Sequence, residues 1–79
     1  MNPNRRFKRF DVRPLLARGI TPLSAIEQRL AGLGDGEGLV VQAPFLPSPL
    51  IEMLQGQGWE SRFERGARAE WLVYFWRSN

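Results

Sequence analysis

The side chains best suited to binding chemistry gather just before two segments with helical apolar spacing. These ligand-binding candidates are Arg13, Arg18, Gly19, Thr21, Phe45 and Ser48. A helix N-terminus presents unpaired backbone N–H groups and partial positive charge, so it attracts anions. Two such termini beside two arginines, with Phe45 as an apolar wall, predict a pocket for an anionic ligand or an acidic protein segment. In the alternative interpretation the arginines are surface charges, and Thr21 and Ser48 only cap the helices.

The residue types give little support to catalysis. The chain has no cysteine and no histidine, which excludes disulfides, thiolate nucleophiles and histidine-based acid–base chemistry. Its serines therefore lack a histidine partner, and an ion pair with Arg13 accounts for Asp11. We expect a protein that is not an enzyme and that carries no metal or cofactor.

A second candidate surface lies in the last apolar segment. Leu72, Tyr74 and Trp76 alternate with a second row, Trp71, Val73 and Phe75. If helices cover one face of the sheet, one of these rows lies on the open face, and the sequence does not tell which. An exposed aromatic row suits a protein partner or a homodimer first. Coverage by arginine stems comes second, and stacking of single-stranded RNA bases third.

Four strand-like and two helix-like segments position these residues. The strands are expected at residues 7–12, 39–43, 59–64 and 70–77, and the helices at residues 21–33 and 48–57. Period-two alternation indicates the first and third strands, with Phe10 and Val12 pointing to the core and residues 59–64 half-buried. Pro14 ends the first strand, and residues 15–20 are expected to form a turn.

Both helices are expected to open in the same way. Thr21 and Ser48 are the predicted N-caps, and Pro22 and Pro49 the first helical residues, where a missing N–H costs nothing. The first helix has an apolar stripe at three- and four-residue spacing, formed by Leu23, Ile26, Leu30 and Leu33.

The order β-α-β-α-β-β predicts an α/β chain of the α+β two-layer sandwich type. A four-stranded mixed sheet would carry two helices on one face, because right-handed crossovers place both helices on the same side. We expect a flexible lead at residues 1–6 and a single domain over residues 7–79. Both strand-to-helix turns then meet at one sheet edge, which brings the ligand-binding candidates together.

Charge and hydropathy limit the classes of partner that we expect. The formal net charge is +3, and much of the excess lies in the first thirteen residues. Such a basic arm can attract nucleic acid or an acidic partner, or simply be solvated. No apolar run approaches 18 residues and no secretory signal is evident, so we expect a cytoplasmic protein without membrane contact.

Two short motifs resemble the TusA-like (SirA-like) domains, and more closely their uncharacterised bacterial relatives. These motifs are Asp11-Val12-Arg13-Pro14-Leu15 with Gly19 and Pro22, and Pro44-Phe45-Leu46-Pro47-Ser48-Pro49-Leu50. The resemblance implies the same β-α-β-α-β-β sandwich, a site before the first helix and a partner in redox or respiratory metabolism. Sulfur-carrier members use a cysteine in a Cys-Pro-x-Pro motif, whereas this chain has Ala17-Arg18 there, so persulfide transfer is excluded.

The sequence thus predicts a small binding or adaptor domain that holds an anionic ligand or acidic protein segment before its first helix. The alternative is an RNA-binding module that uses the open sheet face and the basic N-terminal arm.

Overall fold

The computed structural model describes residues 6–77, which form four strands and three helices. In chain order these are β1 (Arg6–Asp11), α1 (Arg13–Ala17), α2 (Leu23–Ala31), β2 (Glu37–Ala43), α3 (Ser48–Gly56), β3 (Glu60–Arg65) and β4 (Trp71–Trp76). The strands form one sheet in the order β1-β2-β4-β3, with β1 and β2 parallel and the other two pairs antiparallel. The predicted four-stranded mixed sheet is therefore confirmed.

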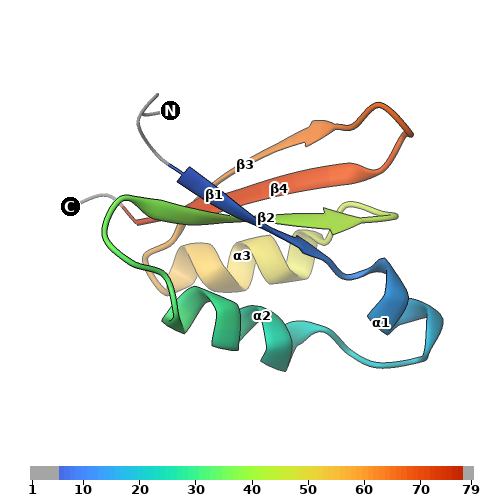
Figure 1. Cartoon of the computed structure of the whole chain (residues 1–79), viewed down its shortest axis with the longest axis horizontal. Helices are drawn as coiled ribbons and strands as arrows, with labels where there is room; N and C mark the ends of the chain where they lie inside the picture. Colours follow the sequence, from blue (N-terminus) through green and yellow to red (C-terminus); the bar gives the residue numbers. More distant parts are fainter. Residues whose placement is uncertain (1–5, 78–79) are drawn as a thin grey trace.

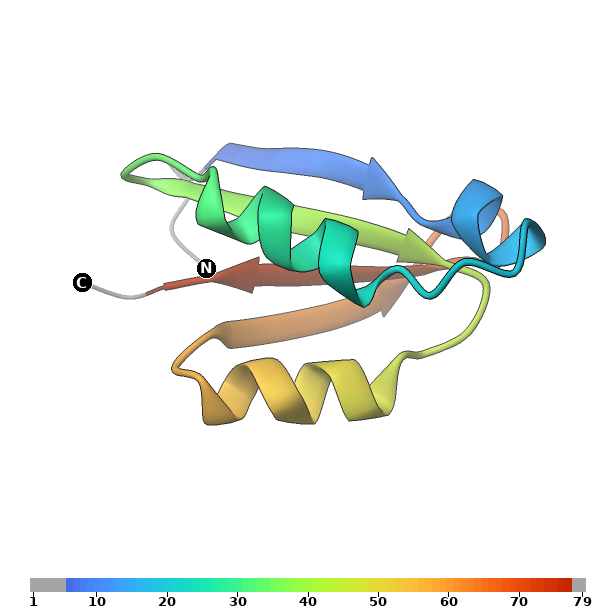
Figure 2. The ribbon, with the colours of Figure 1, turned by 90° about the horizontal axis from the view of Figure 1, so that it is seen from below.

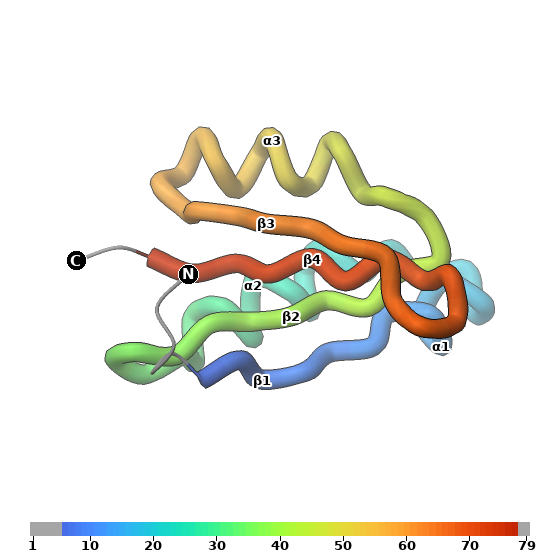
Figure 3. The backbone as a smooth tube through the Cα atoms, turned by 90° about the horizontal axis from the view of Figure 1, so that it is seen from above, coloured from blue at the N-terminus to red at the C-terminus, as the bar shows by residue number. Residues whose placement is uncertain are grey.

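The fold has two layers. Helices α2 and α3 lie side by side under one face of the sheet, and α1 lies at the end where β1 finishes (Figures 1 and 2). Seen from the other side, the sheet has no helix over it (Figure 3). This is the α+β arrangement that the element order predicts.

The core lies between the sheet and the two long helices. Its most deeply buried large side chains come from both layers and are Phe75, Ile26, Leu39, Leu54, Val41 and Val73, each less than 2% exposed. Because Val73 and Phe75 point to the helices, the alternate row of Leu72, Tyr74 and Trp76 belongs to the open face. The structure thus answers the question that the sequence leaves open.

The starts of the helices differ from the prediction. Helix α2 begins at Leu23 with Pro22 as its N-cap residue, and α3 begins at Ser48 with Pro47 as its N-cap residue. Because the two prolines hold the N-cap positions, Thr21 and Ser48 are not N-caps, and neither helix has a side-chain capping hydrogen bond. Ser48 and Pro49 instead occupy the first helical turn of α3, where their backbone N atoms need no intrahelical partner.

Two further segments correct the prediction. The expected turn at residues 15–20 begins inside a helix, because α1 tolerates Pro14 in its first turn for the same reason. Strand β3 is not half-buried: it lies at the sheet edge, and Phe63 on it is 48% exposed. Arg6 opens β1 and does not belong to a lead segment, while residues 1–5 of that expected lead lie outside the described residues.

Candidate functional site

An apolar groove opens on the helix side of the sheet, at the end where β1 and β2 finish. It has a volume of about 310 Å³ and lies between the starts of α2 and α3. Its floor is formed by Val12, Ile26 and Val41, and its walls include Leu16 and Met53. Among all its lining residues, Thr21 alone carries a polar side chain. The groove therefore favours an apolar group.

The groove brings together two of the six ligand-binding candidates. Thr21 and Phe45 both line it, from the loops before α2 and α3 respectively. Phe45 is 54% exposed, the most exposed large apolar side chain among the described residues. Ser48 is exposed at the start of α3 but does not line the groove. An apolar ring left in water beside an apolar hollow is typical of a binding surface.

Arg13 lies at the same end of the molecule and is held by Asp11. Its Nε and NH2 donate to the two carboxylate oxygens at 2.9 and 2.8 Å, and its backbone N–H donates to Oδ1 at 3.0 Å. These hydrogen bonds hold the pKa of Asp11 below its ordinary value and raise that of Arg13. The ion pair that the sequence predicts is present and fixes one edge of the guanidinium, while NH1 has no hydrogen bond within residues 6–77.

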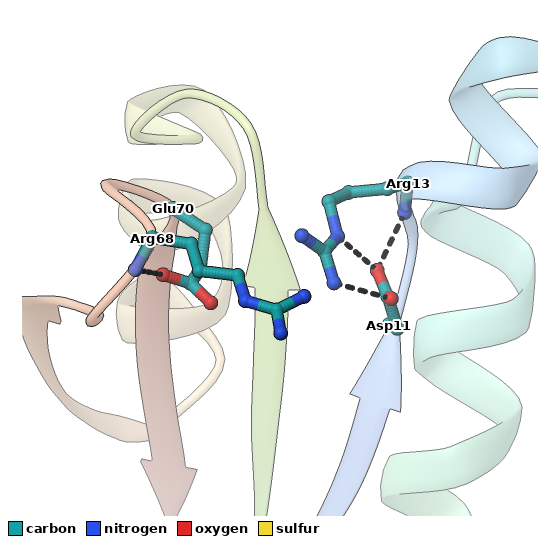
Figure 4. Close-up of polar contacts among 4 residues, drawn as sticks. All are labelled: Asp11, Arg13, Arg68 and Glu70. Carbon is teal, nitrogen blue, oxygen red and sulfur yellow. Dashed lines mark hydrogen bonds and ion pairs between the residues drawn. The ribbon is translucent and has the colours of Figure 1, made fainter.

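The free edge of Arg13 faces a second arginine that the sequence reasoning missed. Arg68, in the β3–β4 turn, extends its guanidinium across the end of β2 toward that of Arg13 (Figure 4). The backbone N–H of Arg68 donates to Glu70 Oε1 at 3.0 Å, which is the main cause of the lowered pKa of Glu70. Glu70 lies close enough to both arginines for their charges to contribute to its lowered pKa, so the carboxylates of Asp11 and Glu70 partly offset the two cations.

The other two candidates lie in the exposed turn that joins α1 to α2. Arg18 ends α1 and is exposed, and its side chain has no hydrogen bond or ion pair among residues 6–77. Gly19 has φ +74°, a left-handed conformation that glycine adopts without strain. Arg18 is thus an accessible cation at the groove end, and Gly19 has a structural reason to be glycine.

The place of Arg68 could be predicted from the position of the β3–β4 turn. When a strand pairs antiparallel with its neighbour, the turn before that strand lies beside the C-terminal end of the neighbour. Because β2 pairs with β4 at Ala43 and Trp71, the turn before Trp71 must lie beside the end of β2. That inference needs the strand order, which the sequence pattern alone does not supply.

The open face carries an aromatic cluster of Phe7, Tyr74 and Trp76. The ring of Phe7 meets Tyr74 edge-on at 5.0 Å between centroids and Trp76 at 6.2 Å. It covers Gly38, and Val40 beside it is only 4% exposed although no helix covers this face. Two of the three sheet-face candidates, Tyr74 and Trp76, are therefore packed against Phe7 and half-buried.

A row of charged residues crosses the middle of this face. Arg9, Val40, Tyr74 and Arg62 are neighbours across β1, β2, β4 and β3. The hydroxyl of Tyr74 donates to Glu64 Oε1 at 2.9 Å. Partial burial and this hydrogen bond raise the pKa of Tyr74, while the two arginines oppose the rise. Leu72 lies beside Glu64 in the next row.

A second hollow, of about 320 Å³, lies at the opposite end of the molecule, beside the α2–β2 loop. Arg77 closes part of it, with its guanidinium 4.2 Å from the centroid of the Trp59 ring and NH1 donating to the Gln57 carbonyl at 3.1 Å. Within residues 6–77, no three acidic, histidine or cysteine side chains gather as a metal ion requires. None of the helices in that part of the chain has the length and apolar character of a membrane span.

The comparison with known families gives one match. The family described as "Uncharacterized conserved protein (DUF2249)" matches residues 9–77, from the middle of β1 to just beyond β4. No curated protein and no solved structure matches the chain.

Proposed function

We propose that this chain, which belongs to the DUF2249 family, is a non-enzymatic binding domain for an acidic protein segment with apolar side chains. The observation that carries the proposal is the apolar groove, together with the exposed side chain of Phe45 that lines it. The segment would place its apolar side chains in the groove and its carboxylates near the arginines at this end of the molecule.

The groove's size and lining support a protein segment better than a small anion. Its volume of about 310 Å³ is at the lower end of ligand pockets, which span roughly 300–1,000 Å³. Such a space suits one or two apolar side chains. A bare phosphate or sulfate would find no charged group among the lining residues. The anion expected from the sequence therefore belongs at the rim and not inside the groove.

The charge at this end supports an acidic segment. Arg18 is an exposed cation in the turn before α2. Arg13 and Arg68 add two guanidinium groups at the sheet edge, which Asp11 and Glu70 partly offset. Charge complementarity of this kind selects partners and accelerates association. The proposal also includes membership of the TusA-like superfamily, a cytoplasmic location and a partner in redox or respiratory metabolism.

The test is a titration of the protein with a synthetic peptide in which Asp and Glu alternate with Leu and Phe. We expect Phe45→Ser and Arg18→Glu each to weaken binding at least about tenfold. Phe45→Ser removes the apolar contact at the groove, and Arg18→Glu replaces an attractive charge with a repulsive one. The matched controls are Phe63→Ser, a similarly exposed phenylalanine outside the groove, and Arg62→Glu on the open face. Equal losses in the controls would contradict the groove as the site.

The second candidate is an RNA-binding module, which the row of Arg9, Tyr74 and Arg62 favours. Aromatic rings between arginines stack bases in single-stranded RNA. This function would be lost in Trp76→Ala and kept in Arg18→Glu, and its binding would fade with added salt.

A further inference from the structure

Strand β3 forms a free edge of the sheet in residues 6–77. It is last in the order β1-β2-β4-β3, so only β4 pairs with it. In Figures 2 and 3, helix α3 runs alongside β3 at this edge, on the covered side of the sheet. A further strand added to β3 would therefore extend the sheet on the side where α3 lies. Free edges of this kind are templates for pairing with another chain.

Backbone groups along β3 alternate between bonding to β4 and pointing out of the sheet edge. This alternation, here called the phase, defines which residues could pair with a further strand. The backbone N–H of Gly66 donates to the Glu70 carbonyl at 2.8 Å, so Gly66 and Glu70 form a hydrogen-bonded pair of the β3–β4 ladder. Such pairs recur at every second residue of an antiparallel ladder. The backbone groups of Ser61, Phe63 and Arg65 consequently point to the outside of the sheet.

This phase permits an antiparallel pairing of β3 with β3 of a second copy, centred on Phe63. Phe63 then lies opposite Phe63 of the second copy, and Ser61 lies opposite Arg65. On the open face, Arg62 lies opposite Glu64 of the second copy, and Glu64 opposite its Arg62. Two-fold symmetry thus produces two attractive charge pairs at the closest cross-strand positions.

Neighbouring registers of the same phase are repulsive. A shift of two residues in one direction places Arg62 opposite Arg62 and Glu60 opposite Glu64. A shift of two in the other direction places Glu64 opposite Glu64. Like charges directly opposite one another destabilise a strand pair, so the charge pattern selects the register centred on Phe63.

The exposure of Phe63 supplies a second reason for pairing. Its ring is 48% exposed on an edge strand and contacts Trp71 edge-on at 5.8 Å between centroids. In the selected register the two Phe63 rings lie on the same face of the continued sheet and shield one another from water. The opposite edge of the sheet is different, because Arg6, Lys8 and Arg9 make β1 strongly basic and self-repelling.

We propose that a second copy of this chain binds along β3, in antiparallel register centred on Phe63, and forms a continuous eight-stranded sheet. Sedimentation equilibrium from micromolar to millimolar protein should show a reversible rise from the 9.1 kDa chain mass to twice that value. A constant 9.1 kDa mass over the whole range would overturn the proposal.

Charge reversal tests the register. Arg62→Glu and Glu64→Arg each replace both attractive pairs with repulsive ones, which should raise the dimer dissociation constant at least about tenfold. Arg9→Glu, a reversal on the opposite edge strand, is the matched control and should leave dimerisation unchanged. Circular dichroism verifies that each variant is folded.

Mixing the two weakened variants gives the decisive result. In a heterodimer of Arg62→Glu with Glu64→Arg, both cross-strand positions again hold opposite charges, so the mixture should dimerise although neither variant does alone. The double variant R62E/E64R should also recover self-association. Failure of both rescues, with every variant folded, would show that this register is wrong. Because neither residue lines the groove, this outcome is independent of the groove's role in peptide binding.

Discussion

Replacing Gly38 with alanine should destabilise the protein, because the aromatic cluster of the open face is built on this glycine. A Cβ at Gly38 would lie 2.5 and 2.7 Å from two carbons of the Phe7 ring and 2.7 Å from the carbonyl oxygen of Phe75. The ring can rotate away, but the carbonyl belongs to strand β4 and moves only if the sheet distorts. Both adjustments disturb close packing.

The expected loss is about 1–3 kcal/mol, the usual cost of inserting a carbon into a filled site. Displacement of Phe7 also weakens its contacts with Tyr74 and Trp76, each worth roughly 0.5–1.5 kcal/mol, which favours the upper part of that range. For a domain of this size the melting temperature falls by about 4–8 °C for each kcal/mol.

Urea unfolding followed by tryptophan fluorescence measures the change, and Gly56→Ala is the matched control. Gly56 ends α3, and nothing lies within 4 Å of the Cβ position there. The same substitution should therefore stabilise the protein at Gly56, by roughly 0.5–1 kcal/mol. If Gly38→Ala proves as stable as the parent protein, the reasoning about the open face is refuted.

Two titratable groups give further predictions. Because the pKa of Asp11 is lowered from its ordinary 3.8 in the folded state, its carboxylate stabilises the fold above that pH, and this contribution is lost as the pH falls through the folded value. Asp11→Asn should cost roughly 0.2–1 kcal/mol in urea unfolding at neutral pH and lessen the acid sensitivity, whereas an unchanged acid profile would count against the pair. Partial burial and the hydrogen bond to Glu64 hold the pKa of Tyr74 above its ordinary 10.0, so stability from the neutral phenol is complete below pH 10.0 and is lost as the pH rises through the folded value. Glu64→Gln should lower the phenol pKa in an ultraviolet titration; a rise would contradict the assigned cause.

The sequence predicts the layers of this fold because each layer has its own apolar period. The stripe of Ile26 and Leu30 in α2 and the burial of Phe10 and Val12 both follow directly from spacing. The start of each helix is less predictable, since a threonine or serine before a proline suits either the cap or a neighbouring position. Here the chain enters both helices without a side-chain cap.

Strand order decides what the sequence could not predict. The exposure of Phe63 follows from the place of β3 at the sheet edge, which period-two alternation does not reveal. Arg68 extends toward Arg13 because β4, which follows its turn, lies beside β2. The groove that contains Thr21 and Phe45 is apolar, since Pro22 and Pro47 line it and the arginines do not.

The most direct test of the proposed function is a backbone amide NMR titration of the protein with the acidic, apolar peptide. The account predicts chemical-shift changes concentrated in residues 16–23 and 45–53, with inorganic phosphate failing to reproduce those in the groove. Shift changes confined to residues 72–76, or none at saturating peptide, would contradict binding at the groove.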